Sequence, residues 1–297
     1  MIRQTKGLST APALAAALGM SAGLSHATPD YTEWSTPEPT VGGGCPIESR
    51  NGKFLYTASG SAGTLDIWTY RRRGSDGVFE FTDRTRADAP VNLDDADDFC
   101  PTPLKAQWLM FVSDRNVEGA CGGTDLYIAR YRPKGAKSSG EPENLGCAGD
   151  GPNTAGTELS PALVKTSEDT FLYFSSDVGG NQDIYRSVLL PNGRYSAGEP
   201  VSSLNTAGDD RQPNLSRDGL TIVFASDRDS GGFDVFMATR DSISSPWSEP
   251  RNLSWELDFA TKTLGETRPS LSWDGQRLYY GAAGTVYLSQ RRPAGNP

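Results

Sequence analysis

Histidine is almost absent from this sequence of 297 residues, in which His26 is the only one. It lies at the end of a segment organised like a secretory signal peptide, with basic residues first, an uncharged Ala/Leu/Gly-rich stretch from 8 to 24, and then a Ser-His-Ala cleavage motif. We therefore expect residues 1–27 to be removed by cleavage after Ala27. The mature chain then has no imidazole, which excludes Ser-His-Asp and Cys-His nucleophiles, histidine-held zinc and lyases with a histidine base.

Long apolar runs and positive charge are also scarce. The apolar stretch of the leader is short for a membrane span, although an uncleaved anchor helix is the alternative, and no later run approaches membrane length. The net charge is −9, and loss of the two positive charges of the leader makes it −11. A surface this acidic repels phosphate backbones and anionic lipid. We expect an exported protein, periplasmic or secreted, with no nucleic-acid partner and no membrane span after cleavage.

Glycine and proline, in contrast, are plentiful. The chain has 33 Gly and 20 Pro, more than an average globular protein of this length. It also has 6 Trp, 11 Tyr and 11 Phe, enough aromatic residues to build a core. This composition is typical of a turn-rich, all-β protein.

One motif recurs five times, and each copy is led by a proline. The leading prolines are spaced by 55, 60, 52 and 56 residues; they are Pro46, Pro101, Pro161, Pro213 and Pro269. The clearest copy reads Pro-Asn-Leu-Ser-Arg-Asp-Gly-Leu-Thr-Ile-Val-Phe-Ala-Ser-Asp-Arg, followed by Gly-Gly-Phe-Asp-Val-Phe. Asp-Gly predicts a tight hairpin turn, the apolar run predicts a second strand buried on both faces, and Gly-Gly-x-Asp predicts a turn into a third strand. A polar stretch then leads to a fourth strand ending in Pro-x-x-Leu, as at Pro90 and Leu93.

Four antiparallel strands in each copy predict the blade of a β-propeller. We expect an all-β, five-bladed β-propeller that forms a single domain over 28–297, with blades at approximately 45–93, 100–145, 160–204, 212–253 and 268–291. The last copy lacks a fourth strand, and residues 33–40 match the approach to one, Trp-Ser-Thr-Pro against Trp-Ser-Glu-Pro. The N-terminal segment should therefore complete the last blade and close the ring, which removes an open sheet edge. A chance match in a flexible tail is the alternative.

These elements, Pro-x-Leu-Ser-x-Asp-Gly, Ser-Asp-Arg and Gly-Gly-x-Asp-Ile-Tyr, resemble the TolB-like β-propeller repeat, and the resemblance covers Trp34 to Arg291. The resemblance implies the propeller fold. It is weak for function, because such repeats occur in scaffold proteins, in periplasmic partners of the cell envelope and in gating domains of enzymes. The chain departs from TolB itself, which has six blades and a separate α/β domain.

Acidic residues stand three positions before the leading prolines in four of the copies. The five positions are Gly43, Asp98, Glu158, Asp210 and Glu266. The strand order of the family places them beside the central channel, at the mouth of one face. There they could hold a cation or cationic ligand, or supply the carboxyl pair of a glycoside hydrolase. The alternative, which the repetition favours, is that each carboxylate accepts backbone N–H bonds and ties one blade to the next.

The residues immediately before the leading prolines vary instead. They are Cys45, Cys100, Ser160, Gln212 and Arg268, and they share the parity of the acidic positions. The predicted binding set at the channel mouth is Asp98, Glu158, Asp210, Glu266 and Arg268, on the face that carries the turns between second and third strands. For Arg268, a surface salt bridge is the alternative role. We assign no catalytic residue.

Four cysteines remain in the mature chain, and in an exported protein this favours disulfides. Cys45 and Cys100 hold equivalent positions in neighbouring blades. Cys121 lies in a turn between second and third strands, and Cys147 just after the fourth strand of the same blade. Of the three pairings that four cysteines allow, we predict Cys45–Cys100 and Cys121–Cys147.

Repeated aspartates after the second strands and on the third strands suggest calcium at first sight. They are Asp114, Asp177, Asp227, Asp66, Asp125, Asp183 and Asp234. Their spacing does not match an EF-hand, and aspartates in such turns usually bind backbone N–H groups. We expect no metal ion and no cofactor, with calcium as the alternative.

Two functional classes remain. The first is a non-catalytic, monomeric propeller that acts as a recognition or scaffold module for a protein, peptide or glycan partner. The second is a carbohydrate-active hydrolase or lyase that works without histidine, through the carboxylates of the channel. The missing histidine and the regular acidic positions favour the first.

Overall fold

The computed structural model describes residues 34–61, 63–74, 80–135, 137–167, 169–229 and 232–291. The predicted signal peptide and its cleavage site lie outside these residues. Over the part of the chain that is described, no helix is long and apolar enough to cross a membrane. Nearly all the regular structure there is β, and the helical turns are η2 (Lys105–Gln107) and α1 (Leu253–Glu256).

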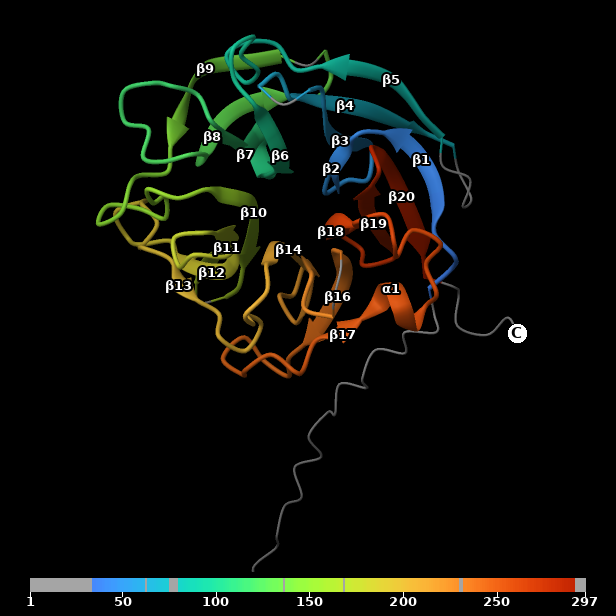
Figure 1. Ribbon diagram of the computed structural model, residues 1–297. Coiled ribbons are helices and arrows are strands. Elements are labelled where there is room, and N and C mark those ends of the chain that lie inside the picture. The colour runs from blue at the N-terminus through green and yellow to red at the C-terminus, as the bar shows by residue number, and fades with distance from the viewer. Residues whose placement is uncertain are drawn as a thin grey trace, which may run out of the picture.

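The strands form five antiparallel sheets of four strands each, set around a central axis (Figure 1). The first two blades are β2 (Gly44–Glu48), β3 (Phe54–Ser59), β4 (Asp66–Arg73), β5 (Glu80–Arg86), and β6 (Asp98–Pro103), β7 (Trp108–Ser113), β8 (Asp125–Arg132), β9 (Lys137–Asn144). The third and fourth are β10 (Glu158–Lys165), β11 (Thr170–Ser176), β12 (Asp183–Val188), β13 (Glu199–Pro200), and β14 (Asp210–Leu215), β15 (Thr221–Ser226), β16 (Asp234–Thr239), β17 (Arg251–Asn252). The fifth is β18 (Thr267–Leu271), β19 (Arg277–Ala282), β20 (Thr285–Gln290) and β1 (Glu38–Gly42). The predicted five-bladed β-propeller is confirmed.

The N-terminal strand closes the ring, as predicted. In the fifth blade the strand order is β1-β20-β19-β18, so β1 supplies the missing fourth strand (Figure 1). Trp34 pairs with Arg291 ahead of this strand, and the Thr40 hydroxyl donates to the Val286 carbonyl at 3.0 Å. The edge of β20 is therefore covered by the start of the chain, which protects it from pairing with another molecule.

The core lies between the blades. Leu109, Met110, Phe111 and Val112 of β7 are all fully buried, so the second strand is covered on both faces as its unbroken apolar run predicted. Five hydrophobic clusters join neighbouring blades around the ring. The apolar surface that holds each blade is thus contributed by its neighbours, and a single blade could not bury it alone.

Every first strand breaks its register at the leading proline. In the second blade the pairing of β6 with β7 shifts between Phe99 and Thr102, and the other blades show the same irregularity. The residues before the prolines all have a left-handed φ between 45° and 58°; they are Cys45, Cys100, Ser160, Gln212 and Arg268. This conformation is costly for such side chains, and a β-bulge re-aims the residue that it contains. Its recurrence makes these five positions a special layer beside the axis, called here the bulge layer.

Asparagine side chains pair with the third strand beyond the end of the fourth strand in three blades. In the third blade β13 has two residues, and beyond it Asn205 Oδ1 accepts the Ile184 N–H at 2.8 Å while its Nδ2 donates to the Ile184 carbonyl at 3.0 Å. Asn92 and Asn153 hold the third strands of the first two blades in the same way. An amide side chain thus takes the place of one strand residue in each of these three blades.

The fourth strand of the first blade ends earlier than the sequence pattern predicted. β5 stops at Arg86, so Pro90 and Leu93 lie in the connection to the second blade and the predicted Pro-x-x-Leu end of this strand is wrong. The physical reason is that Asn92, between them, already satisfies the N–H and the carbonyl of Ile67. The backbone of this segment is therefore free to turn towards the next blade.

Candidate functional site

Asp98 and Asp210 open the first strands of the second and fourth blades, and both are fully buried. Asp98 accepts Nη2 of Arg115 at 2.6 Å, and Asp210 accepts Nη2 of Arg228 at 2.5 Å. Each carboxylate also accepts a backbone N–H from the loop before it. Both arginines come from the Ser-Asp-Arg motif, whose serine hydroxyl accepts their Nε. The motif therefore ties the end of a second strand to the start of the first strand.

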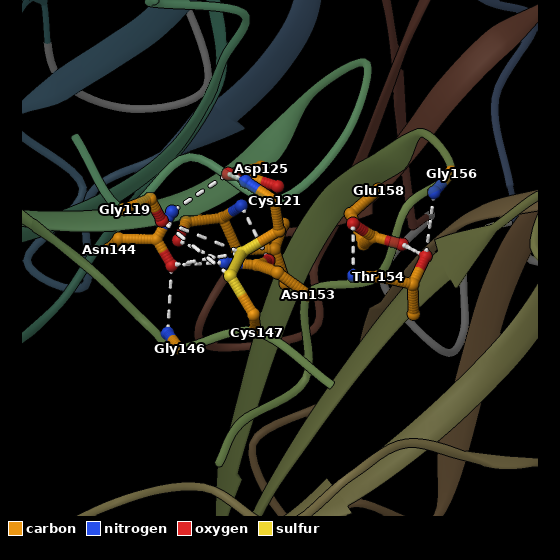
Figure 2. Close-up of a disulfide and its surroundings, with 11 residues drawn as sticks. Gly119, Cys121, Asp125, Asn144, Gly146, Cys147, Asn153, Thr154, Gly156 and Glu158 are labelled. Atoms are coloured by element: carbon orange, nitrogen blue, oxygen red, sulfur yellow. Dashed lines mark hydrogen bonds between the residues drawn. A yellow bond between two sulfur atoms is a disulfide. The ribbon is translucent and has the colours of Figure 1, made fainter. Parts of the chain in front are cut away.

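Glu158 opens β10 in a blade whose Ser-Asp motif lacks the arginine, and its longer side chain reaches hydroxyl groups instead. It accepts from Thr154 Oγ1 and from Ser176 Oγ, both at 2.6 Å. The backbone N–H of Thr154 donates to the same carboxylate at 3.0 Å (Figure 2). Burial raises the pKa of Glu158 above its ordinary value, and these donors partly offset that effect.

Glu266 repeats this arrangement just before β18. Its carboxylate accepts from the hydroxyl groups of Ser254 and Thr261, and the latter also contacts the Tyr280 hydroxyl at 2.6 Å. Burial again raises the pKa of the carboxyl group. The backbone N–H of Glu266 donates to the Phe233 carbonyl of the preceding blade at 2.7 Å, and Asp98, Glu158 and Asp210 make the equivalent bond in their blades.

The four predicted carboxylates thus lie inside the walls of the propeller, at the joints between blades. All four are 0 % exposed, and each is held by donors of its own surroundings. This geometry is that of a blade-to-blade tie. Their role in ligand binding stays a prediction.

Arg268 lies apart from these carboxylates, in the bulge layer. Its backbone N–H donates to Gln212 Oε1 at 2.9 Å, and its Nη2 reaches across to Thr102 Oγ1 of the second blade at 3.0 Å. Glu266 and Asp210 accept their hydrogen bonds from other residues, and the alternative role of Arg268 in a surface salt bridge is wrong because the residue is fully buried. Among the described residues, Nε and Nη1 of Arg268 have no hydrogen-bond partner, although the residue is fully buried. Burial lowers the pKa of this guanidinium to about 9.

Both predicted disulfides are present. Cys45–Cys100 joins the bulge layers of the first two blades, with Cα atoms 4.8 Å apart. Cys121–Cys147 links the turn before β8 to the segment after β9, with Cα atoms 5.5 Å apart. Two disulfides are consistent with an exported protein.

A groove of about 860 Å³ runs between the second and third blades. Its apolar lining comes from Trp108 and Ile128 on one blade and from Leu189 and Tyr195 on the other. The segment 143–150 forms one wall, and Glu143, Asp150 and Arg194 add charge. The groove therefore combines an apolar floor with a few charged groups.

The Cys121–Cys147 disulfide fixes the wall of this groove (Figure 2). Beside it, Asn144 Nδ2 donates to Asp125 Oδ2 at 2.8 Å, and Asn144 Oδ1 accepts from Asn153 Nδ2 at 2.7 Å. The wall and the turn beneath it also approach at backbone distance, because a Cβ on Gly122 would lie 2.4 Å from the Gly156 carbonyl oxygen. The groove wall is therefore held covalently and by a closed hydrogen-bond network.

Sequence reasoning missed this groove. The spacing of 60 residues between Pro101 and Pro161, the longest of the four, marks this region, because the turn between β7 and β8 (114–124), which carries Cys121, is longer than in the other blades. The lining residues come from separate strands and loops, so no single motif collects them.

The repeated Ser-Asp aspartates also receive a structural explanation. Asp114, Asp177 and Asp227 each accept the backbone N–H of the residue that precedes a first strand, at 2.7 to 2.8 Å. Within the described ranges, no group of three or more His, Cys, Asp or Glu residues could hold a metal ion. The aspartates therefore act as ties between strands.

Comparisons with protein-family models and with curated proteins gave no match. Among solved structures, the chain is similar to the catalytic domain of the Coprinopsis cinerea GH62 α-L-arabinofuranosidase, at 14 % identity and a TM-score of 0.57, over 87 % of this chain and 96 % of that one. It is also similar to the α-L-arabinofuranosidase from Podospora anserina in complex with cellotriose, at 15 % identity and a TM-score of 0.55, over 89 % of this chain and 98 % of that one. Likeness at this identity shows the fold alone.

TolB from Acinetobacter baumannii is another similar structure, at 15 % identity and a TM-score of 0.41, over 83 % of this chain. The chain spans 54 % of the length of that protein, about half. The structural neighbours thus include both TolB propellers and glycoside hydrolase propellers. What is shown of the TolB-like resemblance is the propeller fold, and the finer assignment to that repeat family stays a prediction.

Proposed function

We propose that this protein is an exported, non-catalytic recognition module that binds a glycan or a peptide segment in the groove between its second and third blades. The observation that carries the proposal is the groove itself. A concavity of about 860 Å³ with an apolar floor and a few charged groups has the size and character of a ligand site. Its wall is fixed in advance by Cys121–Cys147, so little order has to be gained on binding.

The buried state of the ring carboxylates supports a non-catalytic role. A glycoside hydrolase needs two carboxyl groups that flank the bond to be cleaved, and an acid or base has to reach the proton that it transfers. Asp98, Glu158, Asp210 and Glu266 are 0 % exposed and already accept hydrogen bonds from neighbouring residues. Their chemistry is therefore directed at the protein itself.

The choice of first probes follows from the structural neighbours. Two of them are named as arabinofuranosidases, one of which was solved with cellotriose, so oligosaccharides with arabinose and cellotriose are tested before peptides. The same neighbours keep the second class, a carbohydrate-active hydrolase without histidine, as the alternative that the experiment has to separate.

The experiment measures binding and product release on the same samples of mature protein. We expect an oligosaccharide or peptide to bind without being cleaved, and Trp108→Ala in the groove to weaken the affinity at least about tenfold, because an aromatic contact residue is lost. Trp255→Ala is the matched control, since Trp255 is 55 % exposed on α1, outside the groove. Equal affinities of Trp108→Ala and Trp255→Ala for the ligand would refute the groove as the binding site. Product release that Asp210→Asn abolishes at an unchanged melting temperature would refute the non-catalytic role.

A further inference from the structure

One end of the axis gathers positive charge although the protein as a whole carries −9. The first strands β2, β6, β10, β14 and β18 surround the axis (Figure 1), and the bulge layer lies near their starts. At their other ends, four residues after each leading proline, stand Arg50, Lys105, Lys165, Arg217 and Trp273. Four of these five equivalent positions are cations. The hairpins between first and second strands thus place a basic rim around one mouth of the axis, at the opposite end from the ring carboxylates.

A small pocket opens at this mouth. It measures about 50 Å³ and is lined by residues of all five first strands, with Arg50 and Trp273 at its rim. The guanidinium of Arg50 lies 4.2 Å from the centre of the Trp273 ring, and that of Arg217 lies 5.5 Å from it. This space is enough for a group of a few heavy atoms and too small for a sugar ring.

Thr102 connects the pocket to the buried guanidinium of Arg268, which does not itself line the pocket. Thr102, which lines the pocket, accepts Nη2 of Arg268, while Nε and Nη1 have no partner among the described residues. Nε of Arg50 is likewise buried without a hydrogen-bond partner in that part of the chain. A buried cation without a counter-charge is costly, so an oxyanion bound close to it would offset part of this cost.

The acidic groups nearest to this pocket are already engaged. Glu48, which lines it, accepts Nε and Nη2 of Arg277 at 2.8 and 3.1 Å, and the Tyr279 hydroxyl at 2.7 Å. Asp274 also accepts from Arg277, at 2.8 Å. On the next hairpin Asp218 accepts the Ser216 hydroxyl at 2.5 Å. These carboxylates therefore do not neutralise Arg50 or Arg268.

We propose that this axial pocket binds a small oxyanion, a carboxylate or a phosphate, either free or as the acidic group of a larger ligand. The anion would sit between Arg50 at the rim and Thr102 at the base, where it supplies the counter-charge that Arg268 lacks. The site lies on the hairpin end of the axis and is independent of the groove between the second and third blades.

Thermal melting and calorimetric titration of the mature protein test the proposal. The probes are inorganic phosphate, acetate and galacturonate at low millimolar concentration, compared with chloride at equal ionic strength and with neutral galactose. Low concentration is required because phosphate at high concentration stabilises most proteins by exclusion from their surface. We expect at least one oxyanion to raise the melting temperature by several degrees over chloride. Acetate and phosphate acting alone indicate a free anion, and galacturonate acting alone indicates an acidic sugar.

Variants locate the effect. Arg50→Gln should weaken the binding of that oxyanion about tenfold, and Arg268→Met should abolish it. Thr102→Val, which keeps the shape of the side chain, covers the case in which Arg268→Met does not fold, and it should weaken binding too. Arg73→Gln is the control, since this exposed arginine pairs with Asp83 on the outer part of a blade. No stabilisation above that by chloride, or equal stabilisation of Arg50→Gln, Thr102→Val and the unaltered protein, would overturn the proposal.

Discussion

Single polar side chains hold the inner part of this propeller together, and the length of each one matches its partner. Where the first strand opens with aspartate, as at Asp98 and Asp210, the arginine of Ser-Asp-Arg reaches in to meet it. Where it opens with glutamate, as at Glu158 and Glu266, the arginine is missing and hydroxyl groups replace it. A change from aspartate to glutamate at this position of the repeat is therefore accompanied by a change of its hydrogen-bond donors from arginine to hydroxyl groups.

Glu266 should make stability depend on pH in a defined direction. Burial raises the pKa of its carboxyl group above the ordinary 4.5, so the folded state binds the proton more tightly than the unfolded state. Stability is therefore lost as pH rises from about 4.5 through the raised pKa. The melting temperature of the unaltered protein minus that of Glu266→Gln should fall as pH goes from about 4 to about 8. Glu249→Gln, at an exposed position, serves as control, and a difference that stays level or grows with pH would contradict the assignment.

Among the elements of the fold, the blades differ from one another mainly at the ends of strands and in the connections between blades. The apolar second strands are alike in every blade, whereas the fourth strands shrink to two residues in β13 and β17. In the third blade an asparagine side chain compensates for the missing pairs. The connection between β9 and β10, tied by Cys121–Cys147 to the long turn between β7 and β8, forms one wall of the groove.

The asparagine that continues a fourth strand should contribute strongly to stability. Asn92 is 1 % exposed and makes three hydrogen bonds, to the N–H and carbonyl of Ile67 and to the Ala87 carbonyl. Asn92→Ala removes all three bonds and leaves the buried Ile67 N–H without its acceptor, so it should lower the free energy of unfolding by about 3 kcal/mol, measured by chemical denaturation. Asn116→Ala, at an exposed position, should change it by less than about 0.5 kcal/mol. Equal effects of both changes would show that the side-chain pairing is unimportant.

Loss of either disulfide should lower stability, but only loss of Cys121–Cys147 should also weaken binding in the groove. Cys121–Cys147 joins two residues with a sequence separation of 26. Replacement of both cysteines by serine should lower the free energy of unfolding by about 3 kcal/mol and loosen the groove wall. Cys45→Ser with Cys100→Ser should also lower stability but leave the affinity of the groove unchanged, since that bond lies beside the axis. The measurement is denaturation together with titration of a groove ligand. Unchanged affinity after loss of Cys121–Cys147 would contradict the role of the disulfide in the groove.

The features of the fold that could be predicted from the sequence are those that recur in every copy of the repeat or follow from its register. The recurring proline, hairpin turn and apolar run predicted the five blades. Equivalent positions in neighbouring blades predicted Cys45–Cys100, and positions near each other within one blade predicted Cys121–Cys147. The contact of Arg268 could not be predicted in this way, because a β-bulge at the leading proline re-aims its side chain, which reaches Thr102 of the second blade. The groove could not be predicted either, since its lining depends on how two blades and the connection between them pack.

The whole molecule depends on the closure of a ring whose ends are far apart in sequence. β1 pairs with β20, so the first described residues complete the sheet that the last ones leave open. Because the hydrophobic clusters are shared between blades, loss of the closing strand should weaken more than its own sheet.

Deletion of residues 34–42 should therefore cause aggregation or a large fall in the melting temperature, because the edge of β20 is left open. Light scattering and thermal melting measure this outcome. Moving the same residues to a position after residue 297 should restore both properties, since the relocated strand can pair with β20 as the fourth strands of the other blades do. A truncated protein that melts normally would contradict the closure.

The central claim is that the ring carboxylates hold the propeller together and do no chemistry on a substrate. The most direct test is to measure the melting temperature and the cleavage of arabinose-containing oligosaccharides for Asp210→Asn beside the unaltered protein. The account predicts that neither protein cleaves them, and that Asp210→Asn loses about 3 kcal/mol of stability because Arg228 is left without its buried counter-charge. Cleavage by the unaltered protein that disappears in Asp210→Asn, with the melting temperature unchanged, would contradict it.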